Sequence, residues 1–125
     1  MRFPLIGRWE DAQTGHVLIE RLNEAENFIQ RFRGLQFARS LDPDCGLLLR
    51  NCRSVHTLCM RFSIDLFFLS ADWEIHEVWT DVKPWRIVIP RPKQIAHVIE
   101  LAAGHDRNIT TGMKTRFTAN DYVSQ

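Results

Sequence analysis

The spacing of apolar residues predicts one helix in the first third of the chain. Between residues 23 and 35, apolar side chains recur at intervals of three and four positions: Ala25, Phe28, Ile29, Phe32 and Leu35. A single apolar stripe with this period is typical of an amphipathic helix. Asn23 suits the N-cap of that helix, and Gly34 suits its C-terminal end. We therefore expect one main helix near the N-terminus.

Most of the remaining apolar residues occur in short runs or alternate with polar ones, which is typical of β-strands. This pattern predicts strands at residues 16–22, 46–50, 55–70, 74–82, 86–89, 95–101 and 113–118. The segment 55–70 is long for one strand, and a bend is expected near Ser63. Short connections favour antiparallel pairing. The chain is therefore expected to form an α+β fold, with one main helix and a mostly antiparallel, barrel-like sheet.

The length of 125 residues is that of a single small domain, so residues 1–125 are expected to form one unit. Residues 1–15 are expected to form a loosely ordered arm that ends in the turn-like Gln13-Thr14-Gly15. Residues 119–125 resemble a frayed polar tail. No apolar stretch reaches the about 20 residues of a membrane-spanning helix, and the N-terminus lacks the features of a signal peptide. A cytoplasmic protein is expected, and a monomer by default.

Positive and negative charges are nearly balanced over the whole chain. Sixteen Lys and Arg stand against fifteen Asp and Glu, so the formal net charge is +1. No global field would attract nucleic acid or a membrane, and neither partner is expected. Arginines are nevertheless frequent between residues 31 and 61: Arg31, Arg33, Arg39, Arg50, Arg53 and Arg61. That enrichment indicates a site for a small anionic ligand or, equally, a solvated surface.

Cys45, Cys52 and Cys59 are expected to be free thiols, since an odd number of cysteines does not fit a disulfide framework. Their seven-residue spacing is unlike the paired spacing of structural zinc ligands. On one extended strand, His56 and Cys59 would point to opposite faces, so they would not bind the same zinc ion. Cys52, beside Arg53, is the best candidate for a reactive thiol. No metal site and no cofactor is expected.

Two carboxylates, Asp65 and Glu100, occur in otherwise apolar predicted strands. Burying an unpaired charge costs several kcal/mol, so each carboxylate needs a proton, a partner or solvent. The candidate partners are Arg33, Arg39 and Arg61. Two interpretations remain open: structural ion pairs within the fold, or an acid/base pair at a pocket.

His56, Arg61 and Trp85 complete the candidate site. His56 shares a predicted strand face with apolar residues, which is typical of a core histidine that has a hydrogen-bond partner. Trp85 follows a proline between two predicted strands and is expected to be exposed. We expect a cleft lined by His56, Arg61, Asp65 and Glu100, with Trp85 at its edge.

Several short motifs occur in a fixed order along the chain. They are Arg33-Gly34-Leu35, Cys45-Gly46-Leu47-Leu48-Leu49, His56-Thr57, Met60-Arg61-Phe62-Ser63-Ile64-Asp65, Val98-Ile99-Glu100-Leu101 and Ala103-Gly104. Taken together, residues 17–118 resemble the bacterial and archaeal family known as domain of unknown function 192. The resemblance implies a small α+β domain with a β-rich, barrel-like body and a helix near its start. It implies no established activity, cofactor or partner.

The chain departs from the pattern of that family at four positions: Gln36, Ser63, Trp73 and Met113. The residues usual there are methionine, proline, glycine and aspartate, respectively. Replacing a turn glycine by Trp73 alters local geometry. Replacing an aspartate by Met113 removes a carboxylate, which weakens any mechanism that requires a third acid.

These features favour a non-enzymatic binding or accessory module for a small anionic ligand or a peptide, because no catalytic motif accompanies the candidate residues. The alternative is a hydrolase in which Asp65 or Glu100 acts as general base and an arginine stabilises an anion. A third interpretation is structural: Arg33 pairs with Asp65 or Glu100 only to stabilise the fold.

Overall fold

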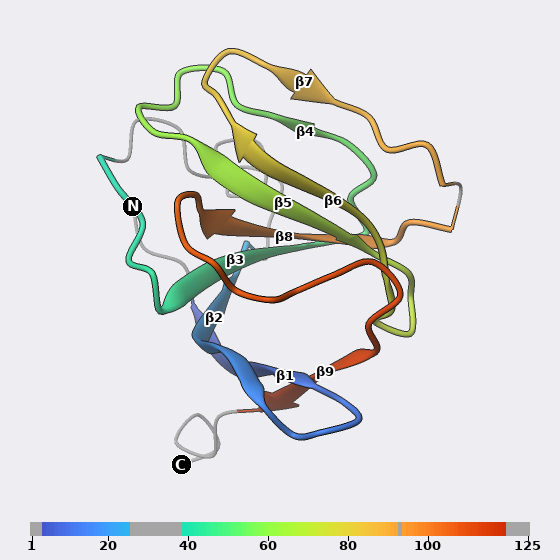
Figure 1. Ribbon diagram of the computed structural model, residues 1–125. Coiled ribbons are helices and arrows are strands. Elements are labelled where there is room, and N and C mark those ends of the chain that lie inside the picture. Colours follow the sequence, from blue (N-terminus) through green and yellow to red (C-terminus); the bar gives the residue numbers. More distant parts are fainter. Residues whose placement is uncertain (1–3, 26–38, 93, 120–125) are drawn as a thin grey trace.

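The computed structural model describes residues 4–25, 39–92 and 94–119, which form nine strands in two sheets (Figure 1). The strands are β1 (Leu5–Asp11), β2 (Val17–Glu24), β3 (Cys45–Arg50), β4 (Val55–His56), β5 (Ile64–Leu69), β6 (Ile75–Val82), β7 (Ile87–Val88), β8 (His97–Ala102) and β9 (Thr115–Ala119). Seven of them form one sheet in the order β6-β5-β8-β3-β2-β1-β9, and β4 pairs with β7 in a small second sheet.

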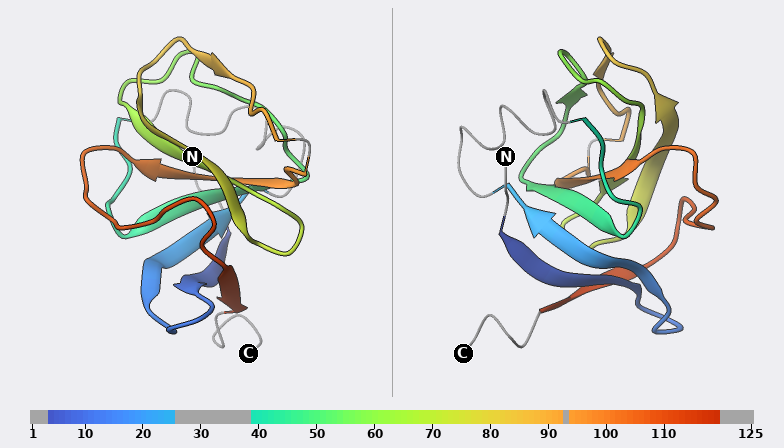
Figure 2. Two further views of the ribbon diagram at one scale, coloured as in Figure 1. Left: turned by 45° about the vertical axis from the view of Figure 1, so that its right-hand side comes forward. Right: turned by 90° about the vertical axis from the view of Figure 1, so that its left-hand side faces the viewer.

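Pairing in the large sheet is antiparallel except between β2 and β3, which run parallel. The sheet twists along its length, so that β1 and β9 at one edge are turned away from β5 and β6 at the other (Figure 2). The small sheet lies on the β5–β6 side of the molecule (Figure 2).

Apolar side chains fill both faces of the central strands. The first cluster lies on the face turned towards the small sheet and joins Leu66 of β5 to Val88 of β7. The second cluster, on the opposite face, joins Phe67 and Ile99 to Trp9 of β1. Strands β5 and β8 are buried at every position. Burial on both faces explains why these strands have continuous apolar runs rather than alternation.

The predicted α+β fold class is wrong: the described residues contain no helix and form mostly one large mixed sheet. Asn23 and Glu24, the expected start of the helix, instead end strand β2. Asn23 pairs with Leu5 on one side and with Leu47 on the other. Ladder hydrogen bonds to two neighbouring strands outweigh the weak local preference of asparagine for a helix start. The rest of the predicted helix lies outside the described residues.

The predicted strand at 55–70 is two strands, β4 and β5, in different sheets. Thr57 explains the separation. Its hydroxyl donates to the Lys83 carbonyl at 2.7 Å and accepts from the Arg86 N–H at 2.8 Å. These bonds attach the end of β4 to the connection between β6 and β7, and the chain turns before β5 begins at Ile64.

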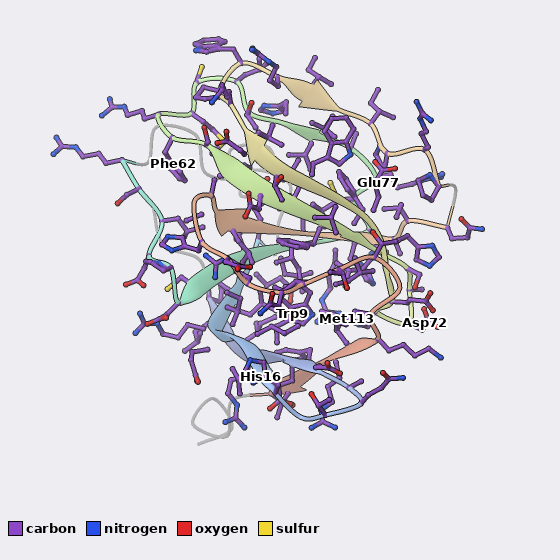
Figure 3. The ribbon with its side chains drawn as sticks, in the orientation of Figure 1. Trp9, His16, Phe62, Asp72, Glu77 and Met113 are labelled. Atoms are coloured by element: carbon purple, nitrogen blue, oxygen red, sulfur yellow. The ribbon has the colours of Figure 1, made fainter. Side chains whose placement is uncertain are left out.

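The segment expected to be part of an arm contains strand β1, which pairs with both β2 and β9. Trp9 of this strand is 0% exposed and lies in the second cluster (Figure 3). Gly7 has φ +151°, and a Cβ there would lie 2.0 Å from the Thr118 carbonyl oxygen. Only glycine permits this close approach of β1 to β9.

Candidate functional site

Asp65 and Glu100 lie on opposite faces of the large sheet. Directly paired residues of neighbouring strands share a face. Asp65 pairs with Leu101, a member of the second cluster, whereas Glu100 pairs with Leu66, a member of the first. The two carboxyl groups are therefore separated by the sheet itself and cannot form one acid/base pair at one pocket.

The Glu100 carboxyl is enclosed in the first cluster. The residue is 3% exposed and lies between Leu66 and Leu47 on the two neighbouring strands. Its Oε1 has no hydrogen-bond partner among the residues that the structure describes. Burial raises the pKa of this carboxyl to about 8. Glu100 is therefore largely protonated and uncharged near neutral pH.

Asp65 is also buried, at 5% exposure, but its carboxylate has a hydrogen-bond donor. The Asp81 N–H donates to Oδ1 of Asp65 at 2.8 Å. Burial raises the pKa of Asp65, while that hydrogen bond and the positive charge of Arg107 oppose the rise. Asp65 therefore stabilises the end of strand β6 from the face of the sheet that carries the second cluster.

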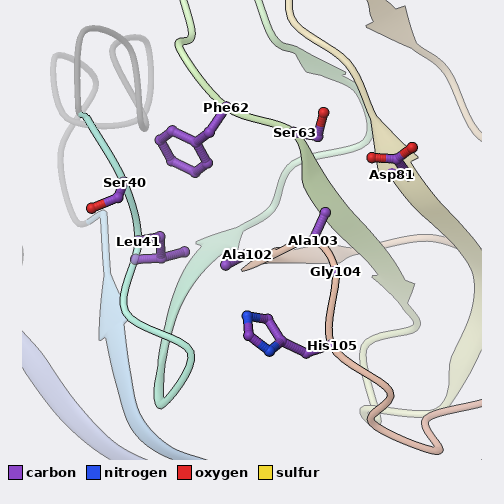
Figure 4. Close-up of a pocket in the computed structure, with 9 residues that line it drawn as sticks. All are labelled: Ser40, Leu41, Phe62, Ser63, Asp81, Ala102, Ala103, Gly104 and His105. Carbon is purple, nitrogen blue, oxygen red and sulfur yellow. The ribbon is translucent and has the colours of Figure 1, made fainter.

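A pocket of about 360 Å³, here named the strand-end pocket, lies where β8 ends and β5 begins (Figure 4). Phe62 and Leu41 supply its large apolar side chains, Asp81 supplies a carboxylate and His105 an imidazole (Figure 4). The other residues that line it are Ser40, Ser63, Ala102, Ala103 and Gly104. An apolar wall with a few polar groups is typical of a small-ligand site.

Arg107 holds the loop that forms one side of this pocket. Its guanidinium donates to the Pro43 carbonyl at 3.0 Å and to the Ala102 carbonyl at 3.2 Å. These bonds fix the segment after β8 against the segment before β3. A second hollow of about 300 Å³, lined in part by Arg107 and His16, shares His105 with the strand-end pocket.

The structure does not bring the sequence-predicted site residues together. His56 lies in the small sheet, where its Nδ1 accepts from the Leu58 N–H at 3.3 Å. Arg61 is exposed, and Trp85 is 62% exposed near the start of β7. These three residues, Asp65 and Glu100 are all absent from the lining of the strand-end pocket.

The expected ion pairs are likewise not formed by the arginines that the structure describes. Arg39 and Arg61 are both exposed, and neither is within salt-bridge distance of Asp65 or Glu100. Arg33 lies outside the described residues, so its predicted role as a clamp stays a prediction.

Sequence reasoning missed Asp81, His105 and Arg107. They come from the end of β6 and from the loop after β8. Asp81 and His105 line the pocket, and Arg107 holds its loop. No local spacing connects these residues, because their proximity depends on which strands are neighbours in the sheet.

The three cysteines, all within the described residues, are half-buried and form no disulfide. In residues 4–25, 39–92 and 94–119, no group of three or more His, Cys, Asp or Glu side chains is placed to hold a metal ion. In the same part of the chain, no helix is long and apolar enough to cross a membrane.

Comparison with known proteins places the chain among uncharacterised relatives. The model of the DUF192 family, described as an uncharacterised ACR, matches residues 10–117. A UPF0127 protein of Pyrococcus furiosus is 40% identical over 70 residues, which cover 54% of this chain and 60% of that relative, less than two thirds of its length. A UPF0127 protein of Pyrococcus horikoshii is 34% identical over 88 residues, covering 68% of this chain and 75% of that relative.

Two crystal structures share the fold. That of a candidate transcription regulator from Sinorhizobium meliloti has a TM-score of 0.74 at 24% identity and covers 94% of this chain and 96% of that chain. That of a protein of unknown function from Novosphingobium aromaticivorans has a TM-score of 0.72 at 17% identity, covering 90% of this chain and 82% of that chain. At this identity the likeness establishes the fold alone.

Proposed function

The chain belongs to the DUF192 family of uncharacterised proteins, and on that premise we propose that it is a non-enzymatic binding module for a small ligand. The observation that carries the proposal is the strand-end pocket. Its volume of about 360 Å³ falls in the range of small-molecule sites, and apolar and polar groups converge in it.

The lining of the pocket indicates the chemistry of the ligand. Asp81 contributes a carboxylate and His105 an imidazole, while Phe62 and Leu41 form an apolar wall. No arginine or lysine lines the pocket among the described residues, although Lys83 Nζ lies 3.3 Å from the Asp81 carboxylate in a largely exposed pair. A compact molecule with an apolar group beside an amine or amide donor fits this lining better than the anionic ligand expected from the sequence.

The binding function is favoured over the hydrolase alternative by the position of the two buried carboxyl groups. A hydrolase that uses Asp65 and Glu100 requires both at one pocket. Here the sheet separates them, and neither lines the strand-end pocket. The peptide ligand expected from the sequence remains compatible with this site, provided that a short side chain enters the pocket.

A thermal-shift screen tests the proposal with two matched sets of compounds, small amines and amides in one and anionic metabolites in the other. A ligand present at one hundred times its Kd stabilises the fold by about 2.7 kcal/mol, which is a shift of several degrees. Compounds of the first set are expected to give that shift.

Ala103→Phe is expected to abolish the shift, because the new ring occupies the pocket that Ala103 lines. Ala71→Phe is the matched control, since it adds the same ring at an exposed turn between β5 and β6. A shift of the same size in Ala103→Phe would refute the assignment of the pocket. The proposal also fails if neither set of compounds shifts the unmodified protein.

A further inference from the structure

Basic residues are segregated in the part of the chain that builds the small sheet. Residues 51–63 and 83–96, which contain β4 and β7, include six Lys and Arg and no Asp or Glu. The remaining residues carry ten Lys and Arg against fifteen Asp and Glu. The net charge of +1 therefore conceals a basic layer, built on β4 and β7, and an acidic remainder. The exposed residues from Trp85 to Arg91, on which the inference rests, do not line the strand-end pocket.

Three large apolar side chains project from the basic layer. Trp85, Ile87 and Ile89 are 62%, 68% and 71% exposed. Ile87 and Ile89 occupy alternate positions and so share one side of their segment, while Val88 between them points into the first cluster. Trp85 lies in the bend just before β7, where its φ is +66°. We name these three residues the apolar ridge. Exposed apolar side chains gathered in this way mark a contact surface.

Cationic residues lie next to the apolar ridge in the sequence. Lys83, Arg86 and Arg91 are all exposed. The Arg86 guanidinium donates to the Pro84 and Trp85 carbonyls at 3.3 and 3.4 Å, which holds its charge beside the turn that carries Trp85. Lys83 pairs with Asp81 at 3.3 Å, but both groups are largely exposed, so this pair is weak.

We infer that the apolar ridge and its flanking cations bind the surface of an anionic lipid membrane. Such a surface supplies both features that the ridge requires: anionic headgroups for the cations and an acyl layer for the projecting side chains. Tryptophan also favours the boundary between these two regions. A basic patch combined with apolar insertion is sufficient for reversible binding to a bilayer.

Other partners fit these observations less well. A second copy of the chain pairing by two-fold symmetry through the ridge would bring Arg86 and Arg91 against themselves, and like charges oppose such contact. Single-stranded nucleic acid needs aromatic side chains on which bases stack, and Ile87 and Ile89 are aliphatic. A protein interface of standard size needs about 20 residues on each side, whereas the ridge consists of three apolar residues.

Vesicle flotation of the full chain tests the inference, with vesicles of phosphatidylcholine alone and of phosphatidylcholine with 30% phosphatidylglycerol. We expect binding to the anionic vesicles at least tenfold tighter than to the neutral ones, and a loss of binding when the salt concentration is raised. Trp85 should then show a blue shift of fluorescence that disappears in Trp85→Ser.

Two sets of variants separate the apolar and the electrostatic contributions. Ile87→Ser with Ile89→Ser is expected to weaken vesicle binding at least tenfold. Arg86→Glu with Arg91→Glu is expected to do the same, whereas the exposed Lys114→Glu, far from the ridge in the sequence, changes it less than threefold. Unchanged thermal midpoints show that these variants fold.

Equal binding to neutral and anionic vesicles, or full binding by both double variants, would overturn the inference. The inference would also be overturned if the protein did not bind vesicles but bound poly-glutamate or a single-stranded oligonucleotide, and if Arg86→Glu with Arg91→Glu abolished that binding. In that result the ridge serves an acidic protein segment or a nucleic acid, respectively.

Discussion

Glu100 and Asp65 occupy adjacent strands of one sheet but point to opposite faces of it, because Glu100 pairs with Leu66 and Asp65 pairs with Leu101. Each carboxyl group therefore belongs to a separate core. Glu100 has no hydrogen bond to its Oε1 from the described residues, whereas Asp65 accepts one from Asp81. The two groups should respond differently to substitution and to pH.

Glu100→Gln is expected to stabilise the protein in alkaline solution. Burial raises the pKa of Glu100 from its ordinary value of 4.5 to about 8, so its native state favours the protonated form. The contribution of this group is complete below pH 4.5 and is lost as the pH rises through 8, at roughly 1 kcal/mol per pH unit. Glutamine resembles the protonated carboxyl and does not ionise. Urea unfolding at pH 9 should therefore show a gain of a few kcal/mol.

At pH 5 the same substitution should change the free energy of unfolding by less than about 1 kcal/mol, since the native carboxyl is already protonated there. Glu20→Gln is the matched control, because Glu20 is exposed on strand β2. If the stabilities of Glu100→Gln and the unmodified protein change in parallel from pH 5 to pH 9, burial does not raise the pKa of Glu100.

Substitutions of Asp65 should separate the charge of its carboxylate from its role as a hydrogen-bond acceptor. Asp65→Asn keeps an oxygen that accepts from the Asp81 N–H and removes the burial cost of the charge, so stability at pH 7 should be unchanged or higher. Asp65→Leu leaves that N–H without its acceptor and should cost about 1–3 kcal/mol. Chemical denaturation of both variants measures the difference, and equal stabilities would contradict it.

Glu10 should show a pH response of the opposite sign. Its carboxylate accepts from the Thr118 hydroxyl and from the Arg116 guanidinium at 3.0 Å, which lowers the pKa of Glu10 below 4.5. This stabilisation is present above pH 4.5 and is lost as the pH falls through the lowered value. Glu10→Gln should cost about 1–2 kcal/mol at pH 7, since Arg116 is half exposed, and almost nothing at pH 3.

Hydrogen exchange of the β9 amides in Glu10→Gln provides the second measurement, because Glu10 joins β1 to β9. These amides should exchange faster in the variant at pH 7, while the amides of β8, which does not pair with either strand, should not change. Unchanged protection of β9 would mean that the carboxylate does not stabilise this pairing.

The fold was predictable where local pattern and burial agree. Strands β3, β6 and β8 lie close to their predicted segments, because their apolar residues form a run or are interspersed with polar residues between turn signals. Strand β1 was not predictable, since Gly7 interrupts its apolar run. A glycine is required there because the backbone of Thr118, more than 100 residues away in the sequence, approaches closely. Asn23 locally favours the start of a helix, but its pairing with Leu5 and Leu47 on neighbouring strands overrides that preference.

The candidate site was less predictable than the fold. That Asp65 and Glu100 are buried follows from their apolar neighbours in the sequence. Which face each occupies does not follow, because a shift of one residue in the register of two strands reverses the face of every side chain. The pocket residues Asp81 and His105 come together only through the strand order β6-β5-β8.

Trp73 offers the sharpest test of backbone geometry, because it holds a non-glycine side chain at φ +70°. Its ring packs against His97 and Phe117, with centroids 5.7 and 6.1 Å away, and the Arg50 guanidinium lies 5.5 Å above it. Trp73→Ala and Trp73→Gly should both lose about 2–3 kcal/mol of ring contacts. Glycine alone relieves the left-handed backbone, so Trp73→Gly should be more stable than Trp73→Ala by about 1 kcal/mol.

Val78 provides the control for this comparison, since it packs against the same cluster from strand β6 and has no positive φ. Within a strand, glycine destabilises by about 0.5–1 kcal/mol relative to alanine. Val78→Gly should therefore be less stable than Val78→Ala, the reverse of the order at Trp73. Thermal unfolding of the four variants measures both differences. The same order at both positions would show that the Trp73 backbone is not strained, and that a glycine would bring no advantage at this turn.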